Sequence, residues 1–510
     1  MAKLLDCTLR DGGYYTDWDF NSETVEAYIK AINALPIDYI ELGYRNNPNK
    51  EYIGRFGYCP VSVLRHIRQE CTKKLDVMLN EKSTKIKDLD ALLKPIVGLV
   101  DMVRIAIDPK NFDRAVALAE SVKSMGFEVG FNVMYMSKWS SEYPEILMKM
   151  SVLNGWCDLF CMVDSFGGVT PDDVTRIYSE VRKYTDVPIG FHGHNNLQLG
   201  LINSITAMQL GVDFIDATIL GMGRGAGNLN MELLLTYLNA HNGLDVDFNV
   251  LGDVITAFTP LFEQYRWGTN LPYMLAGANC IPQKEVMDWV TNRVYSFNSI
   301  VRALDNRKNN IVDNAKYPVF IPDTLFKKVL VVGGGNSVRD HIDGIKAFID
   351  NDTAIIFSTA RHAKLFSDLD CHKYYSLVGA ESRRMAANVI AEGFHDVVIL
   401  PPYPRTMGTD VPTFAEDHTF ELPSVDFINK FKDSSTTIAF QLALNIADGD
   451  IFAIGYDGYP GSVLSEKEVA LTHENNSIFR AFADAKGAKL KSLTPSIYNE
   501  LQIVSLYQFI

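Results

Sequence analysis

Two short segments, far apart in the chain, carry residues that could hold a metal ion. His192 and His194 are two positions apart, and Asp11 follows the first apolar run of the chain. Side chains two apart on a strand point to the same face, so both imidazoles could be directed at one point. A carboxylate from another strand end would complete a set of two nitrogens and one oxygen, with open positions for water and substrate. The sequence therefore predicts a metal site, provided that these two segments meet in the fold.

Eight short apolar runs in the first half of the chain are the elements that would position these residues. They span residues 3–9, 38–43, 75–79, 102–107, 128–135, 159–164, 189–194 and 214–220. Helical stretches separate them, and the runs begin roughly 25 to 35 residues apart, which is the length of a strand, a helix and two loops. Eight such units predict a (β/α)8 TIM barrel, and a doubly wound open sheet is the alternative.

Polar residues stand at several of these predicted strand ends, where a TIM barrel carries its reactive groups. Arg10 and Asp11 end the first run, Glu41 lies at the end of the second, Asn132 lies within the fifth, and Asp164 ends the sixth. The two histidines end the seventh run. For a single aspartate at a strand end, hydrogen bonding to a loop is the simpler interpretation. The histidine pair combined with an aspartate at another strand end favours a metal site.

Composition predicts a globular protein of more than one domain. The chain has 510 residues, more than one hydrophobic core usually holds. Its net charge of −14 argues against nucleic acid or an anionic membrane as the main partner, and no apolar run is long enough to span a membrane. The seven cysteines are scattered without a Cys-x-x-Cys pair, and the first residues lack a signal-peptide pattern. We therefore predict a reduced, cytoplasmic location.

The second half of the chain differs from the first. Residues 245–316 show no strand pattern and predict a helical extension, with helices over 253–265 and 284–304, followed by a linker. From Lys327 the β/α alternation resumes and predicts a Rossmann-like open α/β domain. The expected organisation is a TIM-barrel domain over 1–244, a helical extension and linker over 245–316, and an α/β domain over 317–510.

One glycine-rich turn in the C-terminal domain could bind an anion. The segment Val332-Gly333-Gly334-Gly335-Asn336-Ser337 follows a predicted strand and could hold a phosphate at a helix N-terminus. It lacks both the Gly-x-Gly-x-x-Gly spacing and the Walker lysine. The two interpretations are a nucleotide or other phosphorylated ligand, and a tight turn without a ligand.

Four motifs, in order along the predicted barrel, together resemble those of the DRE-TIM metallolyases. They are Thr8-Leu9-Arg10-Asp11-Gly12, Val163-Asp164-Ser165-Phe166-Gly167-Gly168, His192-Gly193-His194-Asn195 and Gly221-Met222-Gly223-Arg224-Gly225-Ala226-Gly227-Asn228. This family includes 4-hydroxy-2-oxoacid aldolases, isopropylmalate and homocitrate synthases, and hydroxymethylglutaryl-CoA lyase. The resemblance covers residues 1 to about 240, which is the whole predicted barrel.

The resemblance implies a role for each residue of the metal site. Asp11, His192 and His194 would bind a divalent cation, Mg²⁺ or Mn²⁺, with Zn²⁺ less favoured. Asn228 is either a fourth ligand, as in some members of the family, or an asparagine that shapes its loop. Arg10 would face the substrate oxygen on which the charge of an enolate develops.

Three further residues are expected to act beside the metal. Glu41 matches the acidic position of the family on the second strand and would orient Arg10 or the metal ligands, and a plain ion pair with Arg10 is the alternative. Asp164 and Asn132 are expected to bind substrate.

The chemistry of such a site is consistent with enolate formation. A 2-oxoacid such as pyruvate can chelate one cation through its carboxylate and keto oxygens. A Lewis-acidic ion and a fixed guanidinium would both stabilise the negative charge that develops on the keto oxygen. Retro-aldol cleavage produces this enolate and addition to an aldehyde consumes it. We therefore predict a metal-dependent aldolase, a carbon–carbon lyase of the 4-hydroxy-2-oxovalerate aldolase type, with a 2-oxoacid and an aldehyde as its small-molecule partners.

Two positions depart from the patterns of the family. Met222 stands where hydroxymethylglutaryl-CoA lyases carry a catalytic cysteine, which argues against that activity. The aldolases have an acid/base histidine shortly after Arg-Asp-Gly, whereas this chain has Gly13-Tyr14-Tyr15. Tyr14 is either the proton-transfer group or a wall of the pocket, because a phenol with the ordinary pKa of about 10 is a poor base at neutral pH.

Two other functions stay open. One is a synthase, like isopropylmalate synthase, that condenses an acyl-CoA with a 2-oxoacid in the same type of site. The other is a non-catalytic barrel that serves as a docking or sensing module, and the missing histidine keeps this interpretation open. A homo-oligomer is compatible with each of these functions.

Overall fold

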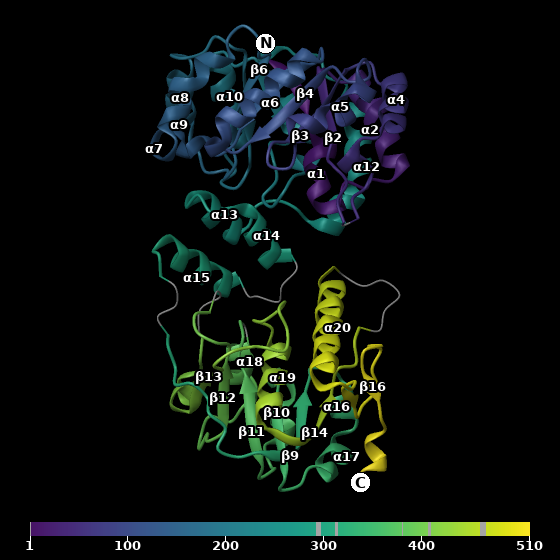
Figure 1. Cartoon of the computed structure of the whole chain (residues 1–510), viewed down its shortest axis with the longest axis vertical. Helices are drawn as coiled ribbons and strands as arrows, with labels where there is room; N and C mark the ends of the chain where they lie inside the picture. The colour runs from purple at the N-terminus through teal and green to yellow at the C-terminus, as the bar shows by residue number, and fades with distance from the viewer. Residues whose placement is uncertain are drawn as a thin grey trace. The chain divides into compact units, whose positions relative to one another are not determined.

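The computed structural model of the chain divides into two compact units, Met1–Val286 and Met287–Ile510 (Figure 1). It describes residues 2–50, 52–291, 297–311, 315–379, 381–405, 410–459 and 466–510. Each unit is built around its own parallel sheet. The three functional parts expected from the sequence stay a prediction.

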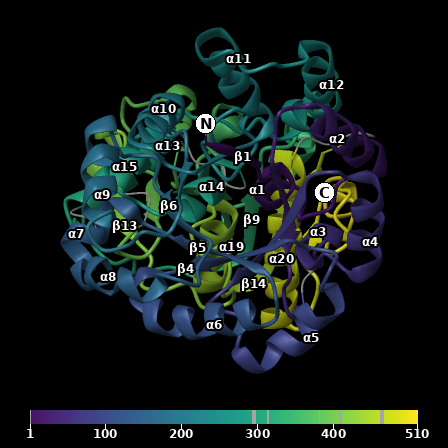
Figure 2. The ribbon, with the colours of Figure 1, turned by 90° about the horizontal axis from the view of Figure 1, so that it is seen from above.

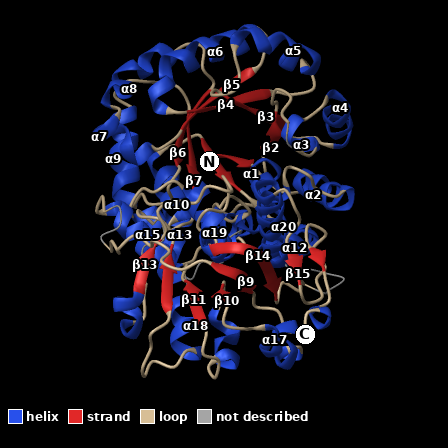
Figure 3. Ribbon diagram, turned by 60° about the horizontal axis from the view of Figure 1, so that its bottom comes forward, coloured by secondary structure: helices blue, strands red, loops and turns tan. Residues whose placement is uncertain are grey.

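The first unit contains a closed barrel of eight parallel strands, which confirms the predicted TIM barrel (Figure 3). Each strand pairs with the next along the chain, and the first pairs with the eighth to close the ring. The strands are β1 (Lys3–Asp6), β2 (Tyr39–Tyr44), β3 (Lys74–Asn80), β4 (Met102–Ile107), β5 (Glu128–Val133), β6 (Leu159–Asp164), β7 (Ile189–Gly193) and β8 (Phe214–Ala217).

An aspartate directly precedes every second strand and fixes the register at the amino end of the barrel. These residues are Asp38, Asp101, Asp158 and Asp213, before β2, β4, β6 and β8. Each accepts a backbone N–H from the preceding strand at 2.7 to 2.8 Å, and the donors are Leu4, Leu75, Val129 and Ile189. A carboxylate satisfies such a donor with a strong, charge-assisted hydrogen bond. The four contacts therefore tie the strands together in pairs.

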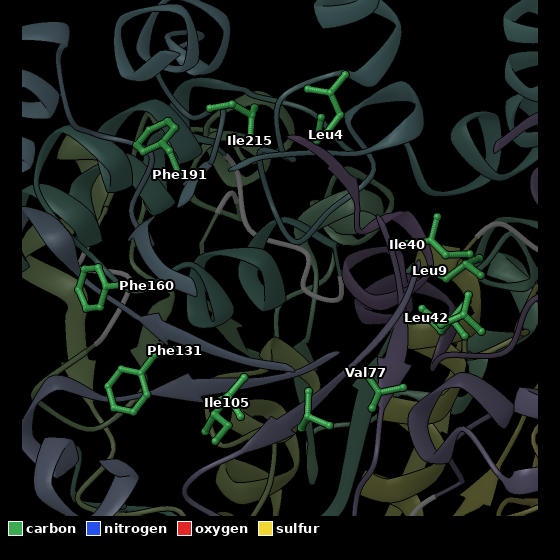
Figure 4. Close-up of a cluster of buried hydrophobic side chains, with 14 of the residues drawn as sticks. Leu4, Leu9, Ile40, Leu42, Val77, Ile105, Phe131, Phe160, Phe191 and Ile215 are labelled. Atoms are coloured by element: carbon green, nitrogen blue, oxygen red, sulfur yellow. The ribbon is translucent and has the colours of Figure 1, made fainter. Parts of the chain in front are cut away.

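Helices cover the outside of the ring, where Figure 2 shows α4 (Val61–Glu70), α5 (Leu89–Leu93), α6 (Phe112–Ser124) and α8 (Pro144–Lys149). The core lies between these helices and the strands, and it contains buried side chains from successive strands such as Ile105, Phe131 and Phe160 (Figure 4). Because strand side chains alternate between two faces, the neighbouring positions point into the barrel. The other helices of this layer are α2 (Ser22–Ala34), α9 (Pro171–Val181), α10 (Gly200–Leu210) and α11 (Met231–Asn242).

The predicted helical extension begins with α12 (Phe248–Tyr265) and α13 (Leu271–Ala278). The single helix expected over 284–304 is instead two helices, α14 (Gln283–Thr291) and α15 (Phe297–Lys308), and residues 292–296 lie outside the described ones. Helix α13 packs directly on the loop after β6, since a Cβ on Gly168 would lie 2.3 Å from the carbonyl oxygen of Gly277.

The second unit contains an open sheet of eight parallel strands in the order β13-β12-β11-β10-β9-β14-β15-β16. Its long strands are β9 (Phe326–Val332), β10 (Thr353–Phe357), β11 (His372–Ser376), β12 (Val397–Leu400) and β14 (Ala447–Ile454). The short ones are β13 (Thr419–Glu421), β15 (Lys491–Ser492) and β16 (Gln502–Ile503). The strand order reverses direction between β9 and β14, which is the point where open α/β sheets usually bind ligands. A relationship to Rossmann-like domains stays a prediction.

Helices cover both faces of this sheet. One apolar cluster includes Phe440 from α19 (Ser435–Ile446) and Phe479 from α20 (Glu466–Lys486). The other includes Ile345 from α17 (Ile342–Phe348) and Met385 from α18 (Glu381–Asn388). No described helix in either unit combines the length and the apolar character needed to cross a bilayer.

Candidate active site at the barrel mouth

Arg10 and Asp11 lie in a helix, α1 (Thr8–Thr16), and not at a strand end as predicted. Strand β1 ends at Asp6, and the backbone N–H of Asp11 donates to Cys7 O at 2.9 Å. Two glycines make this segment a poor helix by intrinsic propensity, which is why the sequence predicts a longer strand. Close packing overrides that preference, since a Cβ on Gly13 would lie 2.1 Å from the ring of Trp18.

The carboxylate of Asp11 is the point where the two predicted segments meet. Its Oδ2 accepts from Asn228 Nδ2 at 2.7 Å and lies 3.5 Å from His192 Nε2. Its Oδ1 pairs with the guanidinium of Arg10. Burial alone would raise the pKa of Asp11, but Arg10 and the histidines lower it below its usual value. The group is therefore a carboxylate at neutral pH.

The two histidines are adjacent, with ring centroids 5.0 Å apart and rings nearly perpendicular. Nδ1 of His192, on β7, lies 2.9 Å from Asp216 Oδ2. Nδ1 of His194, just beyond that strand, lies 2.7 Å from the carbonyl oxygen of Asp164. Each ring therefore uses Nδ1 for a protein contact, which leaves Nε2 for a ligand.

His194 is a neutral imidazole at physiological pH. Burial and the neighbouring His192 lower the pKa of His194 from 6.5 to about 3. A carbonyl oxygen can only accept, so Nδ1 of the neutral ring carries the proton and Nε2 carries the lone pair. This is the protonation state that a metal ligand requires.

Glu41 fixes Arg10 from below. It lies inside β2, is fully buried, and its Oε2 accepts from Arg10 Nε at 2.5 Å. The structure thus brings Glu41, Arg10 and Asp11 together as a continuous chain of charged contacts. A role of Glu41 in orienting Arg10 for chemistry stays a prediction.

The donor types of the candidate ligands fit a divalent cation, although the ligand atoms of Asp11, His192 and His194 do not all lie within 4.8 Å of one another. Asp11 supplies a carboxylate, His192 and His194 supply Nε2 atoms, and Asn228 Oδ1 is buried with no hydrogen-bond partner among the described residues. An amide oxygen without a donor is costly unless something else, such as a cation, occupies that side. A set of two imidazoles with carboxylate and amide oxygens is one that Mn²⁺ or Mg²⁺ can accept.

A second group of ligand atoms shares His192 with the predicted set. Among the described residues, Cys7, His192 and Asp216 have ligand atoms that all lie within 4.8 Å of one another. This group is less suited to a cation, because Asp216 already contacts Arg104 Nη2 at 2.6 Å. Burial and the nearby Asp11 also raise the pKa of the Cys7 thiol well above its ordinary value, so the thiolate does not form readily. We therefore place the candidate metal at the Nε2 side of His192.

Tyr14 lies in an aromatic corner near Arg10. Its hydroxyl is 3.0 Å from the hydroxyl of Tyr44, which ends β2, and Arg224 lies over its ring at 4.8 Å. Trp18 contacts the ring of Tyr14 edge-on, with centroids 5.0 Å apart. The pair of phenols is compatible with proton transfer and with a pocket wall, and the role of Tyr14 stays a prediction.

The two residues expected to bind substrate make structural contacts. Asn132 Oδ1 accepts from Arg104 Nε at 3.0 Å. The carboxylate of Asp164 accepts from the backbone amides of residues 167 to 169 at 3.0 to 3.3 Å and so closes the loop after β6. Burial raises the pKa of Asp164 to about 6, although these amides lower it in part. A direct contact of either residue with substrate stays a prediction.

Three charged residues beneath the mouth were not predicted from the sequence as part of the site. Asp76, Arg104 and Asp216 are fully buried or nearly so, on β3, β4 and β8. Arg104 and His192 hold the pKa of Asp216 at about 2, against the effect of burial. A signal did exist, because each is the only charged side chain inside an otherwise apolar stretch, at a position that points into the barrel.

The glycine turn of the second unit is filled from within the protein. The backbone N–H of Ser337 donates to Asp457 Oδ2 at 2.9 Å, and the hydroxyl of Ser337 donates to Asp457 Oδ1. A Cβ on Gly335 would lie 2.4 Å from that same carboxylate. The amide donors that could receive a phosphate at Ser337 therefore already hold a carboxylate, and phosphate binding in this unit stays a prediction.

A family model described as HMGL-like matches residues 1–255 of the chain. The chain is 30% identical over 261 residues to a 4-hydroxy-2-oxovalerate aldolase from Thermomicrobium roseum, covering 48% of this chain and 69% of the relative. It is 28% identical over 250 residues to an oxaloacetate decarboxylase from Mycobacterium tuberculosis, covering 47% of this chain and 71% of the relative.

A solved structure is more similar in sequence. It is the N-terminal domain of a proposed aldolase from Bacteroides vulgatus, 70% identical, with a TM-score of 0.56. The match covers 59% of this chain and 99% of that structure.

Proposed function

The chain belongs to the HMGL-like family of lyases, and from this premise we propose that it is a divalent-metal-dependent aldolase acting through the enolate of a 2-oxoacid. The observation that carries the proposal is the buried cluster of Asp11, His192, His194 and Asn228 beside the guanidinium of Arg10. The preferred reaction is of the 4-hydroxy-2-oxovalerate aldolase type, as in one of the relatives.

The four clustered residues would hold Mg²⁺ or Mn²⁺ at the mouth. When bound, the cation supplies a Lewis acid that polarises the keto group of the substrate. The hydrogen bonds from Nδ1 of each histidine keep both rings in a fixed orientation, and a fixed ligand needs no reorganisation during the reaction.

Arg10 would stabilise the enolate charge. Its guanidinium is held on one side by Glu41 and next to Asp11 on the other, so its position is set before substrate arrives. A fixed cation in a site that excludes water stabilises developing charge more strongly than one in solvent. Glu41 therefore acts on substrate through Arg10.

Tyr14 is our candidate for the proton transfer that the family assigns to a histidine. In the aldol direction its hydroxyl would give its proton to the oxygen of the aldehyde as the new bond forms. In the reverse direction the resulting phenolate would take that proton back from the substrate hydroxyl. The hydroxyl of Tyr44, 3.0 Å away, can hydrogen-bond to the phenolate and stabilise it.

The test is exchange of the methyl protons of pyruvate with deuterium, followed by NMR, with Mn²⁺ or Mg²⁺ present. We expect exchange by the wild-type protein that requires the metal and is lost in His194→Ala. His66→Ala, an exposed histidine of the same unit, is the matched control and retains exchange. Absence of exchange in the wild type with either ion and with several 2-oxoacids would contradict the proposal.

Two alternative activities can be separated with the same protein. Oxaloacetate decarboxylation passes through the same enolate, and a relative is named for it, so release of CO2 from oxaloacetate without aldehyde cleavage would favour that activity. Consumption of an acyl-CoA together with a 2-oxoacid would favour a synthase. A barrel that binds metal but catalyses none of these reactions would favour the docking module.

The remaining expectations are also proposals. They are a cytoplasmic location, a homo-oligomeric state, and a nucleotide or other phosphorylated ligand in the second unit. None of them is needed for the chemistry at the barrel mouth.

A further inference from the structure

A layer of polar side chains fills the barrel directly beneath the candidate site, where TIM barrels usually carry branched apolar residues. Arg104 is at its centre and is fully buried. Its guanidinium reaches residues on five other strands, and these contacts are Glu41 on β2, Asp76 on β3, Asn132 on β5, Cys161 on β6 and Asp216 on β8. A buried arginine with this many contacts acts on several strands at once.

One branch of these contacts leads to the metal ligands. Arg104 Nη2 lies 2.6 Å from Asp216 Oδ2, and the same oxygen lies 2.9 Å from His192 Nδ1. The carboxylate of Asp216 is therefore held from below by a guanidinium and itself holds the imidazole ring above. Such partners fix the tautomer and the orientation of a metal-binding histidine.

The other branch leads to the group expected to stabilise the enolate. Arg104 Nη1 lies 3.5 Å from Glu41 Oε1, and the other oxygen of Glu41 accepts from Arg10 Nε at 2.5 Å. Glu41 thus lies between two guanidinium groups. Its carboxylate cannot turn away from Arg10 without losing its contact with Arg104.

Only an arginine side chain can contact both carboxylates, Asp216 and Glu41, at the same time. Its planar guanidinium offers five N–H donors in a fixed fork, whereas the ammonium of lysine is a single point of charge. Here Nη2 donates a hydrogen bond to Asp216, whereas Nη1 lies 3.5 Å from Glu41 Oε1 as an ion pair without a hydrogen bond. A lysine at this position would keep the charge but could approach only one carboxylate closely.

We propose that Arg104 is a positioning residue that couples the two halves of the site, setting His192 through Asp216 and Arg10 through Glu41. This inference rests on the proposed function, because it names what orients the groups of that same reaction. Among the described residues, the contacts given above for Arg104 include none of the four candidate ligands, so it would act through Asp216 and Glu41.

The test compares three conservative variants in two separate assays. Mn²⁺ affinity is measured by EPR titration without substrate, and exchange of pyruvate methyl protons is measured with saturating Mn²⁺. We expect Asp216→Asn to weaken Mn²⁺ binding by about 10- to 100-fold. Glu41→Gln should leave Mn²⁺ affinity within about threefold and slow exchange by about 10- to 100-fold. Arg104→Lys should both weaken Mn²⁺ binding and slow exchange.

Arg114→Lys is the matched control, because Arg114 also pairs with a buried carboxylate of the barrel, Glu81, which is not one of the groups joined to Arg104. It should leave both measurements unchanged. The double variant Arg104→Lys/Asp216→Asn should bind Mn²⁺ no more weakly than the weaker single variant, because the two residues act in one branch. Wild-type Mn²⁺ affinity in Arg104→Lys, or full additivity in the double variant, would overturn the proposal.

A second comparison applies if Arg104→Lys does not fold. Asp216→Asn and Glu41→Gln are isosteric, and their effects on exchange, measured at a Mn²⁺ concentration below saturation, should be non-additive if one guanidinium joins the two branches. Additive effects would overturn the coupling. A wild-type protein that binds no Mn²⁺ would refute the proposed function itself, whereas normal binding and exchange combined with an unchanged Arg104→Lys would refute only the role of Arg104.

Discussion

The loops at the carboxyl ends of the strands are held together by different contacts in the two units. At the barrel mouth, Arg10, Asp11, Glu41 and His192 are all nearly inaccessible to solvent and contact one another through charged side chains. At the reversal point of the open sheet, the turns are joined mainly by backbone hydrogen bonds, such as Gly335 N to Gly455 O at 2.7 Å. One region concentrates reactive groups, and the other is closed by its own main chain.

The difference shows what distinguishes a reactive site from a tight turn. General rules place ligands at the carboxyl ends of strands in both architectures. At the barrel mouth, Asn228 Oδ1 is buried without a hydrogen-bond donor among the described residues, as expected of an oxygen that would bind a cation. At the sheet, the carboxylate of Asp457 already accepts from the amide and the hydroxyl of Ser337. A glycine motif at a strand end is thus no evidence of a ligand site by itself.

The largest expected contrast between the regions concerns a single arginine. Arg10→Lys should lower the rate of metal-dependent exchange of pyruvate protons by about 100-fold, because a lysine cannot contact Glu41 and the enolate oxygen with a fixed fork. Arg361→Lys is the matched variant in the second unit, where Arg361 donates to Gly334 O at 2.8 Å. It should leave the rate unchanged. Equal rates in Arg10→Lys and the wild type would remove Arg10 from the chemistry.

The next largest effect is the pH dependence that Asp6 gives to the stability of the barrel. Burial raises the pKa of Asp6 from 3.8 to about 6, although hydrogen bonds from Tyr28 and Thr8 lower it in part. The folded state therefore binds the proton more tightly than the unfolded state, so this group makes stability fall as pH rises from about 4 to about 6. A shift of two pKa units corresponds to about 3 kcal/mol.

Asp6→Asn should remove that contribution. Urea unfolding of the first unit, followed at a series of pH values, measures it as the difference in pH slope between the wild type and the variant. The amide keeps an acceptor for Tyr28 and Thr8, so the comparison isolates the ionisation. Parallel stability curves for the two proteins between pH 4 and pH 6 would contradict the assignment.

The fold was largely predictable because the barrel repeats one pattern. The predicted runs at 102–107 and 159–164 agree with β4 and β6, since both are apolar segments bounded by polar residues. Helix α1 was not predicted because Gly12 and Gly13 have a low helix propensity. The packing against Trp18 and Met222 that overrides this propensity depends on the tertiary structure. Strand β11 gives no clear strand signal in the sequence, because His372–Ser376 carries only two apolar side chains among polar ones.

The candidate site was predictable only in part, for a similar reason. The meeting of Asp11 with His192 was predicted from their residue types, and the pairing of Glu41 with Arg10 from the family resemblance. The structure brings both pairs together, although Arg10 and Asp11 lie in α1 and not at a strand end. Arg104 and Asp216 stand alone in apolar strands, and their significance depends on register across the closed barrel. Spacing along one strand carries no information about which residue faces it from the opposite side.

A smaller effect is expected at the glycine turn of the second unit. Gly335→Ala would place a Cβ 2.4 Å from the carboxylate of Asp457, so either the turn or that carboxylate must move. We expect a loss of about 1 to 3 kcal/mol, confined to the unfolding transition of the second unit. Gly252→Ala is the control, because no atom lies within 4 Å of the added Cβ, and it should not destabilise the protein. Pyruvate exchange should be unchanged in both, since the turn is not part of the barrel.

The smallest effect tests whether the turn can accept an anion at all. In the wild type, inorganic phosphate should shift the melting temperature of the second unit very little, because the Asp457 carboxylate occupies the donors of Ser337 and repels a second anion. Asp457→Ala would free both donors and remove the repulsion. Phosphate should then stabilise this variant more than the wild type, by less than about 1 kcal/mol, since no more than a few N–H and O–H donors are gained. Differential scanning fluorimetry with phosphate, and with chloride at equal ionic strength, measures the difference. If the wild type is stabilised by phosphate as strongly as Asp457→Ala, the anion binds elsewhere at the sheet edge, and the closed turn is no barrier to a phosphorylated ligand.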